Sequence, residues 1–135
     1  MSSRGLRILT EDECFVRLTE TSVGRVSVRI GDAPAILPVN FVLLGRDVMF
    51  RTDAGSKLTQ AIMGVQVAFE VDDVQPSSTP WSVVVVGYAE EVRDTTTLRE
   101  IERLGLRSWA PGDRDHVVRV VTRQVSGRSL VAPPR

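Results

Sequence analysis

The feature that most constrains this chain is a regular alternation of side chains along several of its segments. Between positions 65 and 72, Val or Phe at every odd position alternates with Gln, Ala, Glu and Asp at the even ones. The same period of two, apolar against polar, runs through residues 25–30. Successive side chains of a β-strand point to opposite faces of the sheet, so this period is typical of strands with one buried face. The alternation therefore predicts a mainly β protein.

Four further strands are expected where apolar runs are bounded by turn residues. They are 35–44, 48–52, 81–92 and 117–125. Pro38 places the first of them at a sheet edge or at a bulge, because proline donates no hydrogen bond to a neighbouring strand. Gly87 is expected to break or bend the long strand 81–92.

Only short helices are predicted between the strands. A capping box formed by Thr10 and Glu13 starts the first helix, which should end near position 20. Two others are expected at 56–63 and at 97–104, the latter with apolar residues at positions 98, 101 and 104. Long helices do not separate the strands regularly, so a parallel sheet is unfavourable. We predict one domain over residues 1–135, built as a closed or nearly closed antiparallel barrel of about six strands.

Composition removes several classes of function. Lys plus Arg equals Asp plus Glu at 17 each, and a chain without net charge lacks the basic face that nucleic acid requires. A single cysteine excludes an internal disulfide and a multi-cysteine metal site. With a single histidine, the sequence gives no basis for a Ser-His-Asp catalytic triad. No apolar run approaches the roughly eighteen residues of a membrane span. We expect a cytoplasmic protein without metal, membrane or nucleic-acid partners.

For the individual residues of reactive types, a structural role is expected over a chemical one. Cys14 lies in the first helix pattern and is expected to pack rather than react. His116 opens the last strand, and a surface or interface histidine is favoured over a catalytic one. The carboxylate pairs 72–73 and 90–91 are neighbours on strands, so their members should point to opposite faces.

The segment 50–57 contains the strongest candidate for a ligand-binding site. It places a strand end, a glycine turn and a helix start in succession, with Arg51, Thr52, Ser56 and Lys57 around them. Free backbone N–H groups, two cations and two hydroxyls suit a phosphate monoester. In a simpler interpretation, Ser56 merely caps the helix and both cations are solvated.

Six segments then occur in an order and at a spacing that resemble a known family. They are 23–26, 38–41, 50–57, 67–72, 81–87 and 126–128. The series resembles the short flavin-binding members of the pyridoxamine 5'-phosphate oxidase-like family, and it covers the chain from about position 9 to 130. The resemblance implies a six-stranded antiparallel split β-barrel with short peripheral helices. It also implies a homodimer with cofactor sites at the subunit interface.

Residue roles follow from the same resemblance. The FMN phosphate would contact the strand end and helix start, through Arg51, Thr52, Ser56 and Lys57. The isoalloxazine ring would be lined by the backbone of Pro38, Val39 and Asn40.

The other end of the ring has its own predicted contacts. Trp81 and Ser82 would approach the polar edge of the ring. Trp109 covers a cofactor in the partner subunit or packs on its own barrel. Pro80 stands where relatives usually carry glycine, which leaves the contact at the ring edge open. The arginine-rich substrate segment of true pyridoxamine phosphate oxidases is not recognisable beyond positions 127–128, so that substrate is not assigned.

Three functions remain open. The first is an FMN-dependent oxidoreductase acting on a small molecule, in which the flavin ring carries the hydride chemistry and no acid or base is required. The second is a deazaflavin-dependent reductase, whose cofactor needs a basic groove; Arg4, Arg7 and Lys57 are its candidates. The third is a non-enzymatic flavin or haem binder, with His116 as the only histidine available to the iron. Valines on both faces of segment 81–86 favour a symmetric dimer in each case.

Overall fold

Strands dominate the part of the chain that the structure describes. The computed structural model describes residues 5–53, 57–75, 79–106 and 115–130, and only the backbone at 53, 57 and 115. Its elements in chain order are β1 (Leu6–Ile8), α1 (Glu11–Thr19), β2 (Val23–Ile30), β3 (Ala33–Leu44), β4 (Asp47–Asp53), α2 (Lys57–Ile62), β5 (Gln66–Asp73), β6 (Trp81–Val92), α3 (Thr95–Arg103) and β7 (Asp115–Leu130).

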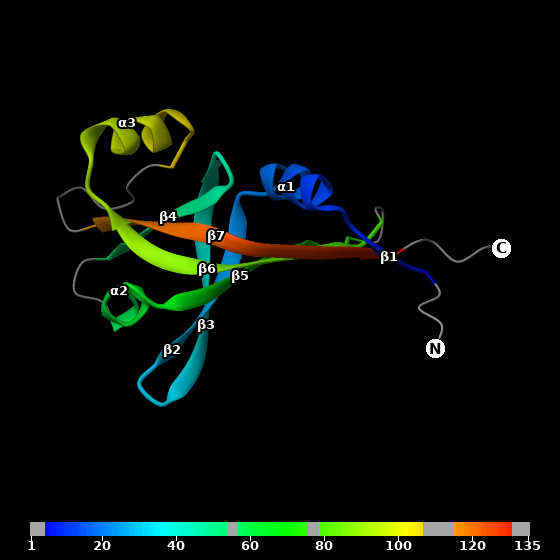
Figure 1. Ribbon diagram of the computed structural model, residues 1–135, viewed down its shortest axis with the longest axis horizontal. Helices are drawn as coiled ribbons and strands as arrows, with labels where there is room; N and C mark the ends of the chain where they lie inside the picture. Colours follow the sequence, from blue (N-terminus) through cyan, green and yellow to red (C-terminus); the bar gives the residue numbers. More distant parts are fainter. Residues whose placement is uncertain (1–4, 54–56, 76–78, 107–114, 131–135) are drawn as a thin grey trace.

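The strands close into a barrel. They pair antiparallel in the order β1-β7-β4-β3-β2-β5-β6, and a further pairing of β6 with β7 joins the two ends of the series. β2 to β7 thus form a closed six-stranded barrel, with the helices at its periphery (Figure 1). β1 is a short addition to β7, on which Leu6 pairs with Leu130. The predicted antiparallel split barrel with short peripheral helices is confirmed.

The pairing of β6 with β7 is irregular at Gly87, where the sequence predicted a break or a bend. The register of β6 with β7 shifts between Val86 and Gly87, which is a β-bulge. A Cβ atom at Gly87 would lie 2.2 Å from the carbonyl oxygen of Val121. Only glycine permits this close approach of the two backbones.

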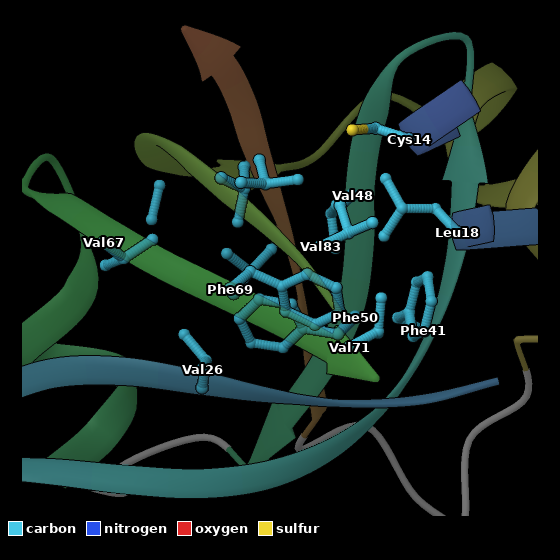
Figure 2. Packing of buried hydrophobic residues seen from close by; sticks show 14 of the residues in the cluster. Cys14, Leu18, Val26, Phe41, Val48, Phe50, Val67, Phe69, Val71 and Val83 are labelled. Carbon is cyan, nitrogen blue, oxygen red and sulfur yellow. The ribbon is translucent and has the colours of Figure 1, made fainter. Parts of the chain in front are cut away.

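Aromatic and branched side chains fill the barrel. Phe50 of β4 and Phe69 of β5 lie in the middle of the buried cluster (Figure 2). Val26 of β2 and Val83 of β6 belong to the same cluster. The rings of Phe69 and Phe41 pack edge to face, with centroids 4.8 Å apart and planes at 70°. This packed interior leaves the ends and the outer face of the barrel for binding.

Helix α1 packs against the core from outside the barrel. Its predicted capping box is present: the Glu13 N–H donates to Thr10 Oγ1, and the Thr10 N–H donates to the Glu13 carboxylate. Cys14 and Leu18 project from α1 toward the buried cluster (Figure 2). Cys14 is fully buried, and that burial raises the pKa of its thiol, so the packing interpretation is confirmed.

Helix α3 covers the barrel wall with a second apolar cluster. Ile101 is buried there beside Met49 of β4 and Val117 of β7. Leu104, predicted to share this face, is instead 46% exposed, because the helix ends at Arg103 and Leu104 is its C-cap. The chain turns at Gly105, with φ of +101°, and delivers Leu106 to the cluster in its place.

Strand β3 is divided between two environments. Residues 33–40 pair only with β2, whereas residues 41–44 pair with β4. The backbone edge of 33–40 that faces away from β2 has no partner among the described strands. Pro38 lies in this part, which confirms its predicted place at a sheet edge.

Two strand predictions were incomplete. The last strand was expected at 117–125, but β7 runs from Asp115 to Leu130 because β4, β6 and β1 pair along its whole length. β1 was not predicted, since three residues carry no readable alternation and depend on β7 for their partners.

Candidate functional site

The end of β4 holds the first two predicted phosphate ligands on opposite faces. Thr52 shares the inward face of Phe50 and is only 7% exposed. Its hydroxyl oxygen accepts a 2.8 Å hydrogen bond from Thr59 of α2. Thr52 therefore holds α2 against the end of the barrel.

Arg51 faces the other way, toward α3. Its Nε donates a 3.1 Å hydrogen bond to the carbonyl oxygen of Leu106. This contact fixes the guanidinium beside the point where the segment containing Trp109 begins. Trp109 itself lies outside the described residues, so its predicted role stays a prediction.

The helix half of the predicted phosphate site is described only by its backbone. Ser56 lies outside the described residues, as does the Lys57 side chain, and α2 begins at Lys57 with six residues. A helix this short contributes little dipole, so the two cations carry most of the argument for an anion. The roles of Ser56 and Lys57 remain predictions.

The three predicted ring-lining residues lie on the open part of β3. Pro38, Val39 and Asn40 pair with Arg25, Gly24 and Val23 of β2, respectively. Val39 packs against the core, while Pro38 and Asn40 are exposed on the outer face. Because their other backbone edge has no described partner, its polar groups are available to a ligand.

Trp81 and Ser82 begin β6, far along the barrel from Arg51. The Trp81 side chain is 6% exposed, and the Arg17 guanidinium carbon lies 5.6 Å from its ring centroid. Ser82 lies on the outer face in register with Asp72 and Arg128 on the neighbouring strands. These residues line a cavity of about 240 Å³, shared with Leu6, Val74, Pro80 and Leu130. Trp81 thus combines a core position with one wall of a pocket.

The register of β7 separates the two halves of the predicted site. Thr52 pairs with position 116 of β7, whereas Trp81 pairs with position 129. Thirteen residues of extended strand span about 43 Å, at roughly 3.3 Å per residue. One protomer therefore does not bring the phosphate ligands and the Trp81–Ser82 pair to a single flavin.

The strand pairing assembles a polar pair that the sequence analysis did not find. His116 Nδ1 lies 2.5 Å from Glu91 Oε2, and Arg93 donates to the other oxygen of Glu91 at 3.0 Å. The hydrogen bond from His116, together with Arg93, holds the pKa of Glu91 below its usual range. The two partners are 25 positions apart in the chain, and only the β6–β7 register places them side by side.

A second charged cluster lies on the outer face of β5. Arg25 donates to both Glu70 and Asp72, each at 3.2 Å. Burial raises the pKa of Glu70 to about 7, with a further contribution from the neighbouring Asp72 carboxylate. Arg25 thus lies between two carboxylates on this face.

Comparison with known proteins decides the family. The model of the family described as pyridoxamine 5'-phosphate oxidase matches residues 10–129, nearly the whole chain. The chain belongs to the pyridoxamine 5'-phosphate oxidase family. An uncharacterized protein of Mycobacterium tuberculosis is 36% identical over 99% of this chain and 91% of its own length.

Two solved structures of the same barrel extend the comparison. A FAD-binding protein from Mycobacterium smegmatis is 38% identical, with a TM-score of 0.83 over 93% of this chain and 98% of that one. A FAD-binding protein from Mesorhizobium loti is 25% identical, with a TM-score of 0.75 over 92% of this chain and 97% of that one.

Membership in the pyridoxamine 5'-phosphate oxidase family confirms the resemblance read from the six segments. It does not assign the individual ligands. Within the described residues, no group of three or more His, Cys, Asp and Glu side chains is placed to hold a metal ion. The described helices are likewise too short or too polar to cross a bilayer.

Proposed function

We propose that this member of the pyridoxamine 5'-phosphate oxidase family is a flavin-dependent oxidoreductase that binds its cofactor between two subunits. The observation that carries the proposal is the likeness to the Mycobacterium smegmatis FAD-binding protein, at 38% identity over 93% of this chain. A bound flavin would supply the hydride transfer. In support, the described residues include a cation at the end of β4, an open backbone edge on β3 and a pocket at the start of β6.

The residues fit a flavin in three places. Arg51 supplies a cation at the end of β4, on the face turned toward α3. The open edge of β3 at Pro38–Asn40 presents backbone groups to the polar atoms of a ring system. Trp81 and Ser82 line the pocket at the other end of the barrel.

A dimer reconciles the separation of these places. About 43 Å of strand lies between the Thr52 and Trp81 positions on β7. Two chains related by a twofold axis would bring the phosphate end of one protomer to the pocket of the other.

The outer face of the barrel is suited to such an interface. Ile36 is 68% exposed on β3, and Val84 and Val86 lie half-buried on the outer face of β6. A specific dimer should bury well over roughly 1,000 Å².

FMN and FAD are the two cofactor candidates. The cluster predicted around Arg51 and Lys57 suits the terminal phosphate monoester of FMN. The two solved relatives described above are FAD-binding proteins, which favours FAD as the second candidate.

A deazaflavin and a haem have weaker support than a flavin. A deazaflavin tail requires an extra basic groove, but Arg7 is already paired with Glu13 at 3.0 Å. For a haem iron, His116 is the single histidine that the sequence offers.

The test is the absorbance spectrum of the purified protein, followed by mass identification of the released ligand. Oxidised flavin, deazaflavin and haem have distinct visible bands. A bound flavin whose mass is that of FMN or FAD would support the proposal. A colourless protein that takes up neither nucleotide on titration would refute it.

A further inference from the structure

The pair of His116 and Glu91 lies beside one of the predicted phosphate ligands, Thr52. His116 stands directly opposite Thr52 in the β4–β7 pairing. Opposed residues of an antiparallel pair share one face, with Cβ atoms about 4.5–5.5 Å apart. The end of β4, the start of β7 and helix α2 meet at one end of the barrel (Figure 1). The histidine therefore belongs to the same neighbourhood as Thr52 and Thr59.

The imidazole is held in a defined orientation. Its Nδ1 contacts Glu91 on β6, so Nε2, on the other edge of the ring, is directed away from that carboxylate. Within the described part of the chain, Nε2 has no hydrogen-bond partner. The side chain is 33% exposed, which leaves it accessible to a ligand.

Neutralising the charge of the Glu91 carboxylate does not account for the contact that His116 makes with it. Arg93 already donates to Glu91 at 3.0 Å, so the carboxylate has a cation without His116. A carboxylate on Nδ1 instead fixes the ring orientation and leaves Nε2 as the ring nitrogen that a ligand can reach. Nε2 then offers a charge-assisted hydrogen bond to an anion.

We propose that His116, oriented by Glu91, is a further phosphate-binding residue of the flavin nucleotide site. This inference rests on the proposed flavin function and names a ligand of that same site. Nδ1–H donates to Glu91 while Nε2–H donates to a phosphate oxygen, so the imidazolium lies between two anions. Thr52, opposite on β4, borders the same position.

The test compares FMN with riboflavin, which lacks the phosphate, by fluorescence titration of the full chain. In His116→Asn the amide nitrogen can replace Nδ1 toward Glu91, but nothing replaces Nε2. This variant should bind FMN about ten- to a hundredfold more weakly and bind riboflavin as the parent does. His116→Gln places an amide nitrogen near the Nε2 position and should lose less.

Two carboxylate variants separate orientation from general charge. Glu91→Gln should weaken FMN binding by several-fold, because the ring loses its anionic partner. Glu90→Gln is the matched control, since Glu90 is the adjacent carboxylate on the opposite face of β6. It should leave both ligands unaffected.

Failure of this inference is distinguishable from failure of the proposed function. If Lys57→Ala weakens FMN binding but His116→Asn does not, the phosphate site stands and His116 is not part of it. If His116→Asn weakens FMN and riboflavin equally, the histidine supports the ring pocket or the fold, and the inference is wrong. If the parent protein binds neither ligand, the proposed flavin function fails.

Phosphate binding at His116 can also be probed directly, even if the parent protein binds neither FMN nor riboflavin. The chain has one histidine, so its ring-proton resonances in an NMR spectrum belong to His116. Added inorganic phosphate should shift them in the parent protein and shift them less in Glu91→Gln. Resonances that stay unmoved at phosphate concentrations of tens of millimolar would overturn the inference.

Discussion

Gly24→Ala tests how closely β2, the partner of the predicted ring-lining residues on β3, packs against the core. A Cβ atom at position 24 would lie 2.2 Å from Cζ and 2.6 Å from Cε1 of Phe69. The Phe69 ring is fully buried and packs against the Phe41 ring at a 4.8 Å centroid distance. The ring cannot retreat without displacing the core.

The expected cost follows from overpacking, which typically destabilises by about 1–3 kcal/mol. An unfolding entropy of roughly 2.1 cal/mol/K per residue gives about 0.28 kcal/mol/K for a chain of 135 residues. Gly24→Ala should therefore lower the Tm by about 4–11 °C, measured by circular dichroism or calorimetry.

A second substitution checks the physical cause. Phe69→Leu removes the ring atoms that the new methyl group would meet, so the double variant should be more stable than the sum of the two single losses predicts. The reasoning is refuted if Gly24→Ala melts with the parent protein. It is also refuted if the two losses are simply additive, because then Phe69 is not the obstacle.

Three other outcomes are expected. Lys57→Ala should weaken FMN binding about ten- to a hundredfold and leave riboflavin binding nearly unchanged, by flavin fluorescence titration; equal losses for both ligands would contradict the phosphate assignment. Light scattering at micromolar concentration should give the mass of a dimer, and a monomer would contradict the interface proposal. The pKa of Glu70 is raised to about 7, so the folded state holds more protons than the unfolded state between about pH 4.5 and 7. The free energy of unfolding should fall as the pH rises through that window. Glu70→Gln should have a higher Tm than the parent at pH 8 but not at pH 5. A parallel pH dependence of Tm in both proteins would show that another group is responsible.

Local signals in the sequence predicted most of the barrel. The capping box at Thr10, the irregular pairing at Gly87 and the edge position of Pro38 each rest on residues close together in the chain. The ends of β7 and the whole of β1 carry no such signal. Their strand conformation is imposed by partners elsewhere in the chain, which a local pattern does not reveal.

The candidate site divides in the same way. The succession of a strand end and a helix start around Arg51 and Lys57 could be predicted because β4 and α2 follow one another in the chain. The contact of His116 with Glu91 was missed because it depends on the register of two long strands. The distance between Thr52 and Trp81 likewise emerges only from their positions along β7.

The open edge of β3 has a consequence for how copies of the protein associate. An exposed strand edge is a template on which further chains add without limit. Pro34 and Pro38 lie four residues apart on this edge, and proline fits a sheet where its nitrogen faces away from the neighbouring strand. The edge therefore lacks two of its N–H donors while keeping its carbonyl acceptors. Such an edge still receives donors from a small ligand but resists growth into a continuous sheet, so assembly can stop at a closed, finite particle.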